Sequence, residues 1–326
     1  MDPFRARMYR LIFALAAAYN MAFGLWAALS PYSFFHLFDL EAPRYPSIWS
    51  CLGMVVGLYG AIYAYAAMRL DQAKPLIAIG LVGKLLGPAG WVVAVTSGEL
   101  PVRTFTLITF NDIVWWAPFT LFLMEGTRIA EWARSSAPFV CGSANAIGGL
   151  ALLLALRPGT EVEPDPVRRA LYIAGNPVIW RAGWLAWYAS AVSLLGFYAW
   201  WAARVRRTGW GIAAWCVAAA GIACDLTAES LFIGWLPNEI ETIQRAGTLL
   251  TAGAANGLYT VAGIMLTLLT PGMPTALRVL AWAAWFFGLG LTVSALAGSV
   301  SGMIISTTGL MALFCPWTWL MGMKLK

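Results

Sequence analysis

Residues 75–97, PLIAIGLVGKLLGPAGWVVAVTS, contain a single charged side chain, that of Lys84. A helix rises about 1.5 Å per residue, so a run of this length is long enough to cross a bilayer core about 30 Å thick. The run lacks the period of two that strands of a membrane barrel show. It therefore predicts a membrane-spanning helix.

Similar apolar stretches recur along the whole chain. Hydrophobic residues make up 60% of it and charged residues 11%, whereas soluble domains are about half apolar and a quarter charged. This composition excludes an ordinary soluble protein, a disordered chain and a nucleic-acid binder. We expect an all-α polytopic membrane protein with about ten spanning helices. The predicted spans are 9–30, 46–68, 75–97, 103–124, 138–156, 178–203, 210–235, 247–269, 276–297 and 300–322.

The polar stretch 125–137 interrupts this series after the fourth span. We expect a four-helix membrane domain over residues 1–127, a cytoplasmic linker over 128–137 and a six-helix membrane domain over 138–326. Both blocks then contain an even number of spans, so each begins and ends on the same side of the membrane.

Lys and Arg residues predict the orientation, because cytoplasmic loops carry an excess of them. If the N-terminus lies in the cytoplasm, the larger share of these residues is cytoplasmic too. We therefore expect a protein of the cell inner membrane with both termini in the cytoplasm. The inside set is Arg5, Arg7, Arg10, Arg69, Lys74, Arg128, Arg134, Arg204, Arg206, Arg207, Arg278, Lys324 and Lys326. The outside set is Arg44, Arg103, Arg157, Arg168, Arg169, Arg181 and Arg245.

Three short segments of the first domain carry a resemblance to a known group. They are LGMVVGLYG at residues 52–60, GKLLGPAG at 83–90 and FNDIVWW at 110–116. On these segments, residues 11–124 resemble the DoxX-like four-helix membrane proteins. The resemblance implies a four-helix membrane fold, and some members of that group are linked to quinone or thiol redox chemistry. No catalytic residue set carries over, and the rest of the chain resembles only uncharacterised bacterial membrane families.

Ionisable residues inside spans are costly, so they are candidate functional residues. Lys84 and Asp112 each lie about 13 Å from the end of their own span, which puts both near the membrane midplane. We expect them to form an ion pair, with Asn111 supplying further hydrogen bonds. This polar centre could bind a headgroup or relay a proton, or it could be an internal strut. Pro88 removes a helix hydrogen bond beside Lys84, which favours a cavity there.

A second candidate group is in the predicted span 210–235. Asp225 and Glu229 are four residues apart and share a helix face, so we expect one to be protonated and the other charged. Such a pair suits general acid–base catalysis, and we take the two as candidate catalytic residues. Arg181 is the expected counter-ion, and Asn256 and Tyr259 complete the candidate binding residues. A hydrogen-bonded structural network is the alternative.

The inventory of residues predicts no metal and no cofactor. His36 is the single histidine, the five cysteines form no CxxC pair, and phosphate-loop and HExxH motifs are absent from the sequence. We expect an inner-membrane protein that binds or processes a lipophilic small molecule, with acid–base chemistry as one possibility. The alternatives are a proton-coupled small-molecule transporter and a structural subunit, so whether the protein is an enzyme stays open. Expected partners are membrane lipids, the lipophilic molecule, and partner subunits or further copies of the chain.

Overall fold

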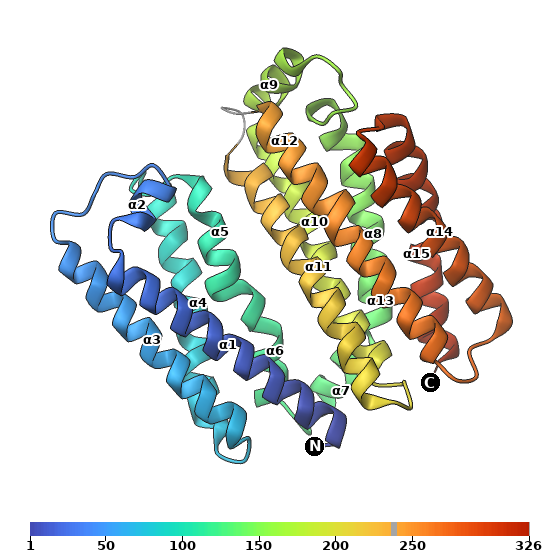
Figure 1. Cartoon of the computed structure of the whole chain (residues 1–326), viewed down its shortest axis with the longest axis horizontal. Helices are drawn as coiled ribbons and strands as arrows, with labels where there is room; N and C mark the ends of the chain where they lie inside the picture. The colour runs from blue at the N-terminus through green and yellow to red at the C-terminus, as the bar shows by residue number, and fades with distance from the viewer. Residues whose placement is uncertain (236–239, 326) are drawn as a thin grey trace. The chain divides into compact units, whose positions relative to one another are not determined.

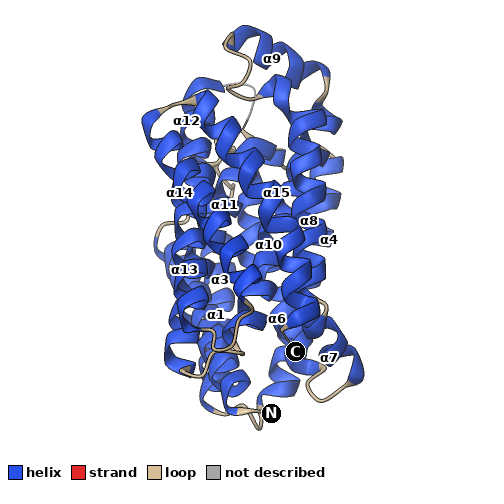
Figure 2. Cartoon of the chain, turned by 90° about the vertical axis from the view of Figure 1, so that its right-hand side faces the viewer, coloured by secondary structure: helices blue, strands red, loops and turns tan. Residues whose placement is uncertain are grey.

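A computed structural model describes residues 1–235 and 240–325, which contain helices and turns but no strand (Figure 2). Nine of the helical segments in this part of the chain are long and apolar enough to cross a membrane. They are Pro3–Leu29, Pro46–Met68, Ala73–Thr96, Val102–Leu123, Ala137–Gly159, Thr208–Gly234, Ile240–Leu269, Thr275–Ala297 and Val300–Lys324. The chain is therefore an all-α polytopic membrane protein, as the sequence predicts.

The one predicted span that is not among those nine, 178–203, is also a helix. It is α10 (Pro177–Ala202), which has 26 residues. It is rich in Trp and Tyr, whose polar ring atoms lower the hydropathy of a segment that is otherwise long enough. Much of its surface is buried against neighbouring helices, including the side chains of Trp180, Trp201 and Tyr198.

The chain divides into two compact units, Met1–Ala130 and Glu131–Lys326, which are described separately below. Unit 1 contains four spans and a short surface helix. Its elements are α1 (Pro3–Leu29), α2 (Ser33–Leu37), α3 (Pro46–Met68), α4 (Ala73–Thr96), η1 (Val102–Thr104), α5 (Phe105–Ile108), η2 (Thr109–Ile113) and α6 (Val114–Leu123). Helix α7 (Arg128–Ser135) occupies the stretch where the sequence predicts a cytoplasmic linker.

Glycines allow α1 and α3 to lie against each other along their length (Figure 1). A Cβ atom on Gly24 would come within 2.5 Å of the Gly57 backbone nitrogen, and one on Gly53 within 2.8 Å of the Ala27 Cβ. Small residues permit this close approach of helix backbones, which is a main source of helix association in membranes. The glycine spacing of residues 52–60 thus shapes the contact with α1.

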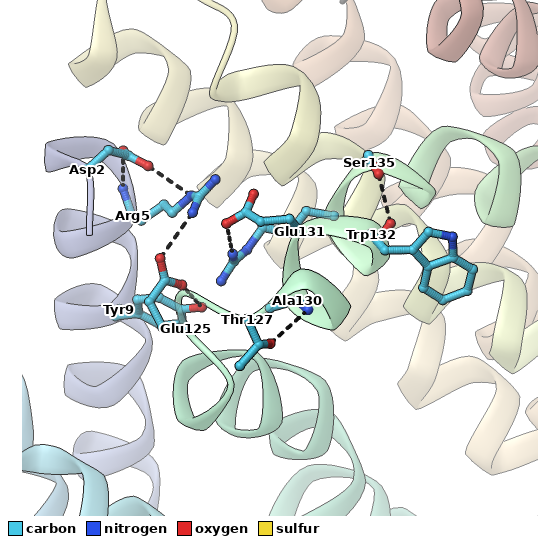
Figure 3. Close-up of polar contacts among 10 residues, drawn as sticks. Asp2, Arg5, Tyr9, Glu125, Thr127, Ala130, Glu131, Trp132 and Ser135 are labelled. Carbon is cyan, nitrogen blue, oxygen red and sulfur yellow. Dashed lines mark hydrogen bonds and ion pairs between the residues drawn. The ribbon is translucent and has the colours of Figure 1, made fainter.

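Aromatic rings fill the centre of unit 1. The ring centroid of Phe13 is 4.8 Å from that of Phe122, and Tyr63 lies 5.3 Å from Phe119. Ionic contacts close the end of the unit where the chain starts (Figure 3). There Arg5 pairs with Glu125 at 3.0 Å and with Asp2 at 2.8 Å.

Unit 2 consists mainly of long helical segments and includes the short helix α9 (Figure 1). Its elements are α8 (Ala137–Ala151), η3 (Leu152–Leu156), η4 (Arg157–Gly159), α9 (Pro166–Gly175), α10, α11 (Thr208–Gly234), α12 (Ile240–Thr248), η5 (Leu249–Ala255), α13 (Asn256–Leu269), α14 (Thr275–Ala297) and α15 (Val300–Lys324). The segments η2, η3 and η5 are π-helical. Such segments are rare and often occur at functional sites.

Tryptophans form the core of unit 2 at the end away from α9. The Trp317 ring lies 5.2 Å from the Trp201 ring and 5.5 Å from the Trp285 ring. Each indole N–H has an acceptor on another helix, including the Leu277 carbonyl for Trp317 at 3.0 Å and the Thr270 hydroxyl for Trp201 at 2.8 Å. These tryptophan side chains are therefore packed against one another with their N–H groups hydrogen-bonded.

Candidate functional site

In unit 1 the predicted pair Lys84 and Asp112 come together between α4 and η2. The Lys84 Nζ atom is 3.9 Å from Asp112 Oδ1, and both side chains are buried. Lys84 also donates to the Asn111 carbonyl oxygen and, at 3.4 Å, to Asn20 Oδ1 on α1. The ammonium group therefore has three protein partners from two other segments of the chain.

The local backbone explains how this pair is positioned. Asn111 and Asp112 lie in the π-helical segment η2, and the Asn111 amide donates to Asp112 Oδ1 at 3.0 Å. The carboxylate lies against Gly87, where a Cβ atom would be 2.8 Å from Asp112 Oδ2. Thus the π-helical turn and a glycine on α4 together make room for a buried carboxylate.

Pro88 leaves the Lys84 carbonyl without its helical donor, as its missing N–H predicts. The Trp116 indole N–H donates to this carbonyl at 2.8 Å. The freed backbone group is thus satisfied by a side chain from α6. Two acceptors at this centre, Asp112 Oδ2 and Asn111 Oδ1, are buried without a hydrogen-bond partner among the described residues.

Unit 2 contains a cavity of about 720 Å³. Its walls are mostly apolar, with polar groups contributed by several of the surrounding elements. The polar and charged lining residues are Asn145, Arg157, Thr160, Glu161, Ser190, Asp225, Gln244, Thr248, Thr251, Asn256, Thr260, Thr307 and Thr308. Aromatic lining residues are Trp180, Trp184, Trp187, Tyr198, Phe232, Tyr259, Trp285 and Phe314.

The mouth of this cavity lies between the α8–η4 segment and α15, because all exposed lining side chains belong to these two segments. Leu150 and Leu153 are 55% and 58% exposed, and Ile304 is 44% exposed. The two segments are tightly packed at Gly142, where Thr318 and Trp319 leave no room for a Cβ atom. The cavity opens between these same two segments, both of which are long and apolar enough to span a membrane.

Asp225 lies at the inner wall of the cavity and is buried. Its Oδ2 atom accepts a hydrogen bond from the Tyr259 hydroxyl at 3.1 Å, and Oδ1 accepts one from the Thr251 hydroxyl. Thr251 belongs to η5, so a π-helical segment again positions a donor beside a buried carboxylate. Asp225 forms no ion pair within the described part of the chain, because both of its partners are neutral.

Asn256 lines the same cavity, but its side-chain amide forms hydrogen bonds with a neighbouring helix. Its amide donates to the Gly288 carbonyl at 2.6 Å and to the Thr292 hydroxyl at 3.0 Å, both on α14. Since both N–H bonds are used, Asn256 holds α13 against α14. The Tyr259 carbonyl accepts from the Tyr198 hydroxyl at 2.8 Å, which ties the residue that contacts Asp225 to α10.

Glu229 is completely buried and does not line the cavity. Neither of its carboxyl oxygens has a hydrogen-bond partner among the described residues. The helix places it one turn from Asp225, as the spacing predicts, but within the described part of the chain it has no cation or hydrogen-bond donor. Burial of a polar group without a partner is costly.

The expected counter-ion for these carboxylates is not where we predicted it. Arg181 is exposed and forms no ion pair with Asp225 or Glu229. It enters α10 one residue after Trp180, whose ring faces the interior, so the Arg181 side chain points to the surface of the unit. The expected Arg181 ion pair is therefore wrong.

Sequence reasoning missed three polar residues of this region. Thr251 is hidden within an apolar run, and only its helical distance from Tyr259 hints that both face α11. Glu161 and Arg169 lie in what reads as a solvated loop, yet Glu161 lines the cavity and Arg169 is buried. Asp165 caps the start of α9 and Pro166 follows it. This Asp-Pro pair is the sequence signal that could have indicated a helix here.

Comparison with protein-family models, curated proteins and solved structures finds no match. The DoxX-like resemblance of residues 11–124 therefore stays a prediction. Among the described residues no group of three His, Cys, Asp or Glu side chains could hold a metal ion. The candidate site is thus defined by its own geometry, as a mostly apolar cavity that opens between two spanning segments and ends at a buried carboxylate.

Proposed function

We propose that this protein is an inner-membrane protein whose unit 2 binds a lipophilic small molecule. The observation that carries the proposal is the cavity that runs from the exposed side chains of α8–η4 and α15 to buried Asp225. Its volume of about 720 Å³ is typical of pockets that enclose small organic ligands. Mostly apolar walls that also carry polar groups able to orient a ligand are typical of such pockets as well.

Asp225 is the group that would orient the ligand. Its oxygens already accept from Thr251 and Tyr259, and each oxygen has capacity for a further hydrogen bond. A hydroxyl or amino group on the ligand would satisfy that capacity. If the protein is an enzyme, Asp225 is the candidate to exchange a proton with the ligand, while Glu229 acts at most through Asp225, because it lies outside the cavity.

Proton-coupled transport is the second candidate function. Polar lining residues continue from Asp225 through Thr251, Thr248 and Gln244 to Glu161, near the α9 end of the helices. Such a row of polar side chains is a possible water path to one membrane face. Proteoliposomes distinguish the two functions, because a transporter acidifies its lumen when ligand is added and a binding protein does not. The third alternative, a structural subunit, requires no ligand in the cavity.

A photoactivatable probe tests the proposal directly. We expect a fatty alcohol bearing a diazirine, added to the protein in lipid nanodiscs, to label cavity residues such as Met303 and Met311 after irradiation. Ala252→Trp places an indole in the cavity and should reduce labelling at these sites several-fold. Ala254→Trp is the matched control, because Ala254 lies on the same segment but is exposed and outside the cavity. Equal labelling of both variants would count against the proposal.

The proposed orientation has both termini in the cytoplasm, which is supported by the distribution of Lys and Arg residues. We expect an N-terminal and a C-terminal tag to react with an impermeant reagent only after the inner membrane is opened. Reaction of either tag in intact spheroplasts would reverse this assignment.

A further inference from the structure

A second, smaller pocket of about 350 Å³ lies near the α9 end of unit 2. Unlike the large cavity, it is lined mainly by charged side chains. They are Arg169 on α9, Arg245 and Glu241 on α12, and Glu161 on the loop before α9; Gly298 and Val300 complete the lining.

Arg169 is the residue in this pocket that requires a partner. It is only 7% exposed, and its Nε atom has no hydrogen-bond acceptor among the described residues. One Nη atom donates to Gln244 Oε1, and Gln244 in turn donates to the Gly159 carbonyl, so the side chain is held in place. Within the described residues Arg169 forms no ion pair, although two carboxylates line the same pocket.

A buried guanidinium differs from a buried carboxyl in one decisive respect. A carboxyl group such as that of Glu229 can become neutral by taking up a proton, whereas arginine stays charged in proteins. An unpaired buried charge is costly, and removal of one partner from a buried pair destabilises a protein strongly. The surroundings of Arg169 therefore favour an anion from outside the chain.

Arg245 supplies a second cation on the other side of the pocket. Its guanidinium donates to the Ala295 carbonyl at 3.0 Å, at the end of α14, and leaves other N–H groups for a ligand. Two guanidinium groups around a small pocket are a typical arrangement for phosphate, because their N–H groups match its oxygens in pairs.

The small pocket and the large cavity are adjacent. Glu161 and Val300 line both of them, so a molecule can occupy the two together. A ligand that fills both would have a charged end at Arg169 and an apolar body between α8–η4 and α15.

We propose that unit 2 binds a lipid with a phosphate headgroup, whose phosphate is held by Arg169 and Arg245 and whose acyl chains occupy the large cavity. This proposal rests on the function proposed above and adds the chemical class of the ligand. Glu161 and Glu241 line the same pocket without pairing with Arg169 among the described residues. Their negative charge disfavours a highly charged anion, so the pocket suits a phosphodiester with a single negative charge better.

The test uses three probes and the full-length protein in detergent. They are dioctanoyl phosphatidylglycerol, dioctanoylglycerol, which has the same acyl chains without phosphate, and inorganic phosphate. We expect the phospholipid to bind at least about tenfold more tightly than dioctanoylglycerol, which is the order of effect for charge-assisted hydrogen bonds. Arg169→Gln should remove that preference and leave dioctanoylglycerol binding unchanged. Arg168→Gln is the matched control, because Arg168 is the exposed neighbour that pairs with Asp165.

The outcomes separate this inference from the proposed function. Equal affinity for the two lipids, or a phosphate preference that survives in both Arg169→Gln and Arg245→Gln, would overturn the headgroup assignment. Inorganic phosphate binding as tightly as the phospholipid would overturn the lipid assignment. Failure of dioctanoylglycerol to bind the wild-type protein would instead count against the cavity itself. If Arg169→Gln lowers the melting temperature strongly, Arg245→Gln decides the result.

Discussion

Each unit buries a carboxylate within a predicted span, but the groups that surround the two carboxylates differ. In unit 1, Asp112 has a cation, Lys84, and an amide donor, Asn111, within the same bundle. In the described part of unit 2, Asp225 has two neutral donors and no cation, and it faces a large cavity. Both carboxylates are positioned with the help of a π-helical segment.

This difference indicates that burial of a charged residue in a span is not by itself evidence of a binding site. Lys84 and Asp112 partly neutralise each other's charge, as expected of a structural ion pair. Asp225 keeps its hydrogen-bonding capacity beside a space that a ligand can enter. Variants of the two centres should therefore separate stability from ligand binding.

The largest effect on stability should come from breaking the pair in unit 1. Lys84→Ala or Asp112→Ala leaves a buried charge without its partner, so each should lower the free energy of unfolding by about 3–5 kcal/mol. The double variant Lys84→Met with Asp112→Leu should recover much of this loss. Denaturant titration in detergent measures all three. A double variant no more stable than the weaker single variant would contradict the pairing.

Asn256 should rank second, because it lines the cavity and yet serves packing. Asn256→Ala removes two hydrogen bonds between α13 and α14 and should cost about 1–2 kcal/mol, in line with such bonds inside membrane proteins. Unfolding curves provide the measurement. An unchanged curve together with lost ligand binding would move Asn256 from the packing group to the binding group.

Asp225→Asn should have the opposite profile, with a small loss of stability and a large loss of ligand binding. The amide has nearly the same shape as the carboxyl group. Its oxygen can still accept from one of the two hydroxyls, and the other hydroxyl can rotate to accept from the new NH2 group, so the cost should stay below about 1 kcal/mol. Binding or turnover of the ligand should fall by at least about tenfold. Tyr259→Phe is a useful companion, since it removes one donor and keeps the carboxylate. Parallel loss of stability and function would favour a structural network.

The smallest effect is expected at Glu229. Both of its carboxyl oxygens are buried without a partner among the described residues, so replacing the group with an apolar one of similar length should remove a polar cost and no hydrogen bond. Glu229→Met should leave the melting temperature unchanged or slightly higher. A clear decrease would mean that this carboxyl group has an essential partner, such as a buried water molecule.

The helices could be predicted well from the sequence, because span length and apolar composition are local properties. All ten predicted stretches are helical, including α10, whose tryptophans lower its hydropathy. The proximity of Lys84 and Asp112 was also predictable, because their depths in two sequential antiparallel helices agree. Similarly, the spacing of Asp225 and Glu229 placed them one helical turn apart.

The cavity could not be predicted, because it depends on how non-sequential helices pack. Helices α8 and α15 pack tightly at Gly142 and the cavity opens between the same two segments, an arrangement that no local sequence pattern records. For the same reason the sequence could not indicate that Asp225 faces the cavity while Glu229 does not. The Arg181 prediction failed because it rested on Arg181 and the carboxylates having similar depths in the membrane. Depth does not determine the direction in which the Arg181 side chain points.

Retention of a lipophilic molecule by the purified protein tests the central claim most directly. Wild-type protein, Ala252→Trp and Ala254→Trp would be purified side by side, extracted with organic solvent and examined by quantitative mass spectrometry. We predict that one lipophilic compound accompanies the wild-type protein and Ala254→Trp in near-stoichiometric amount, and that Ala252→Trp retains several-fold less of it. Equal retention by all three proteins, or no retained compound in the wild type, would contradict the assignment of the cavity as a ligand site.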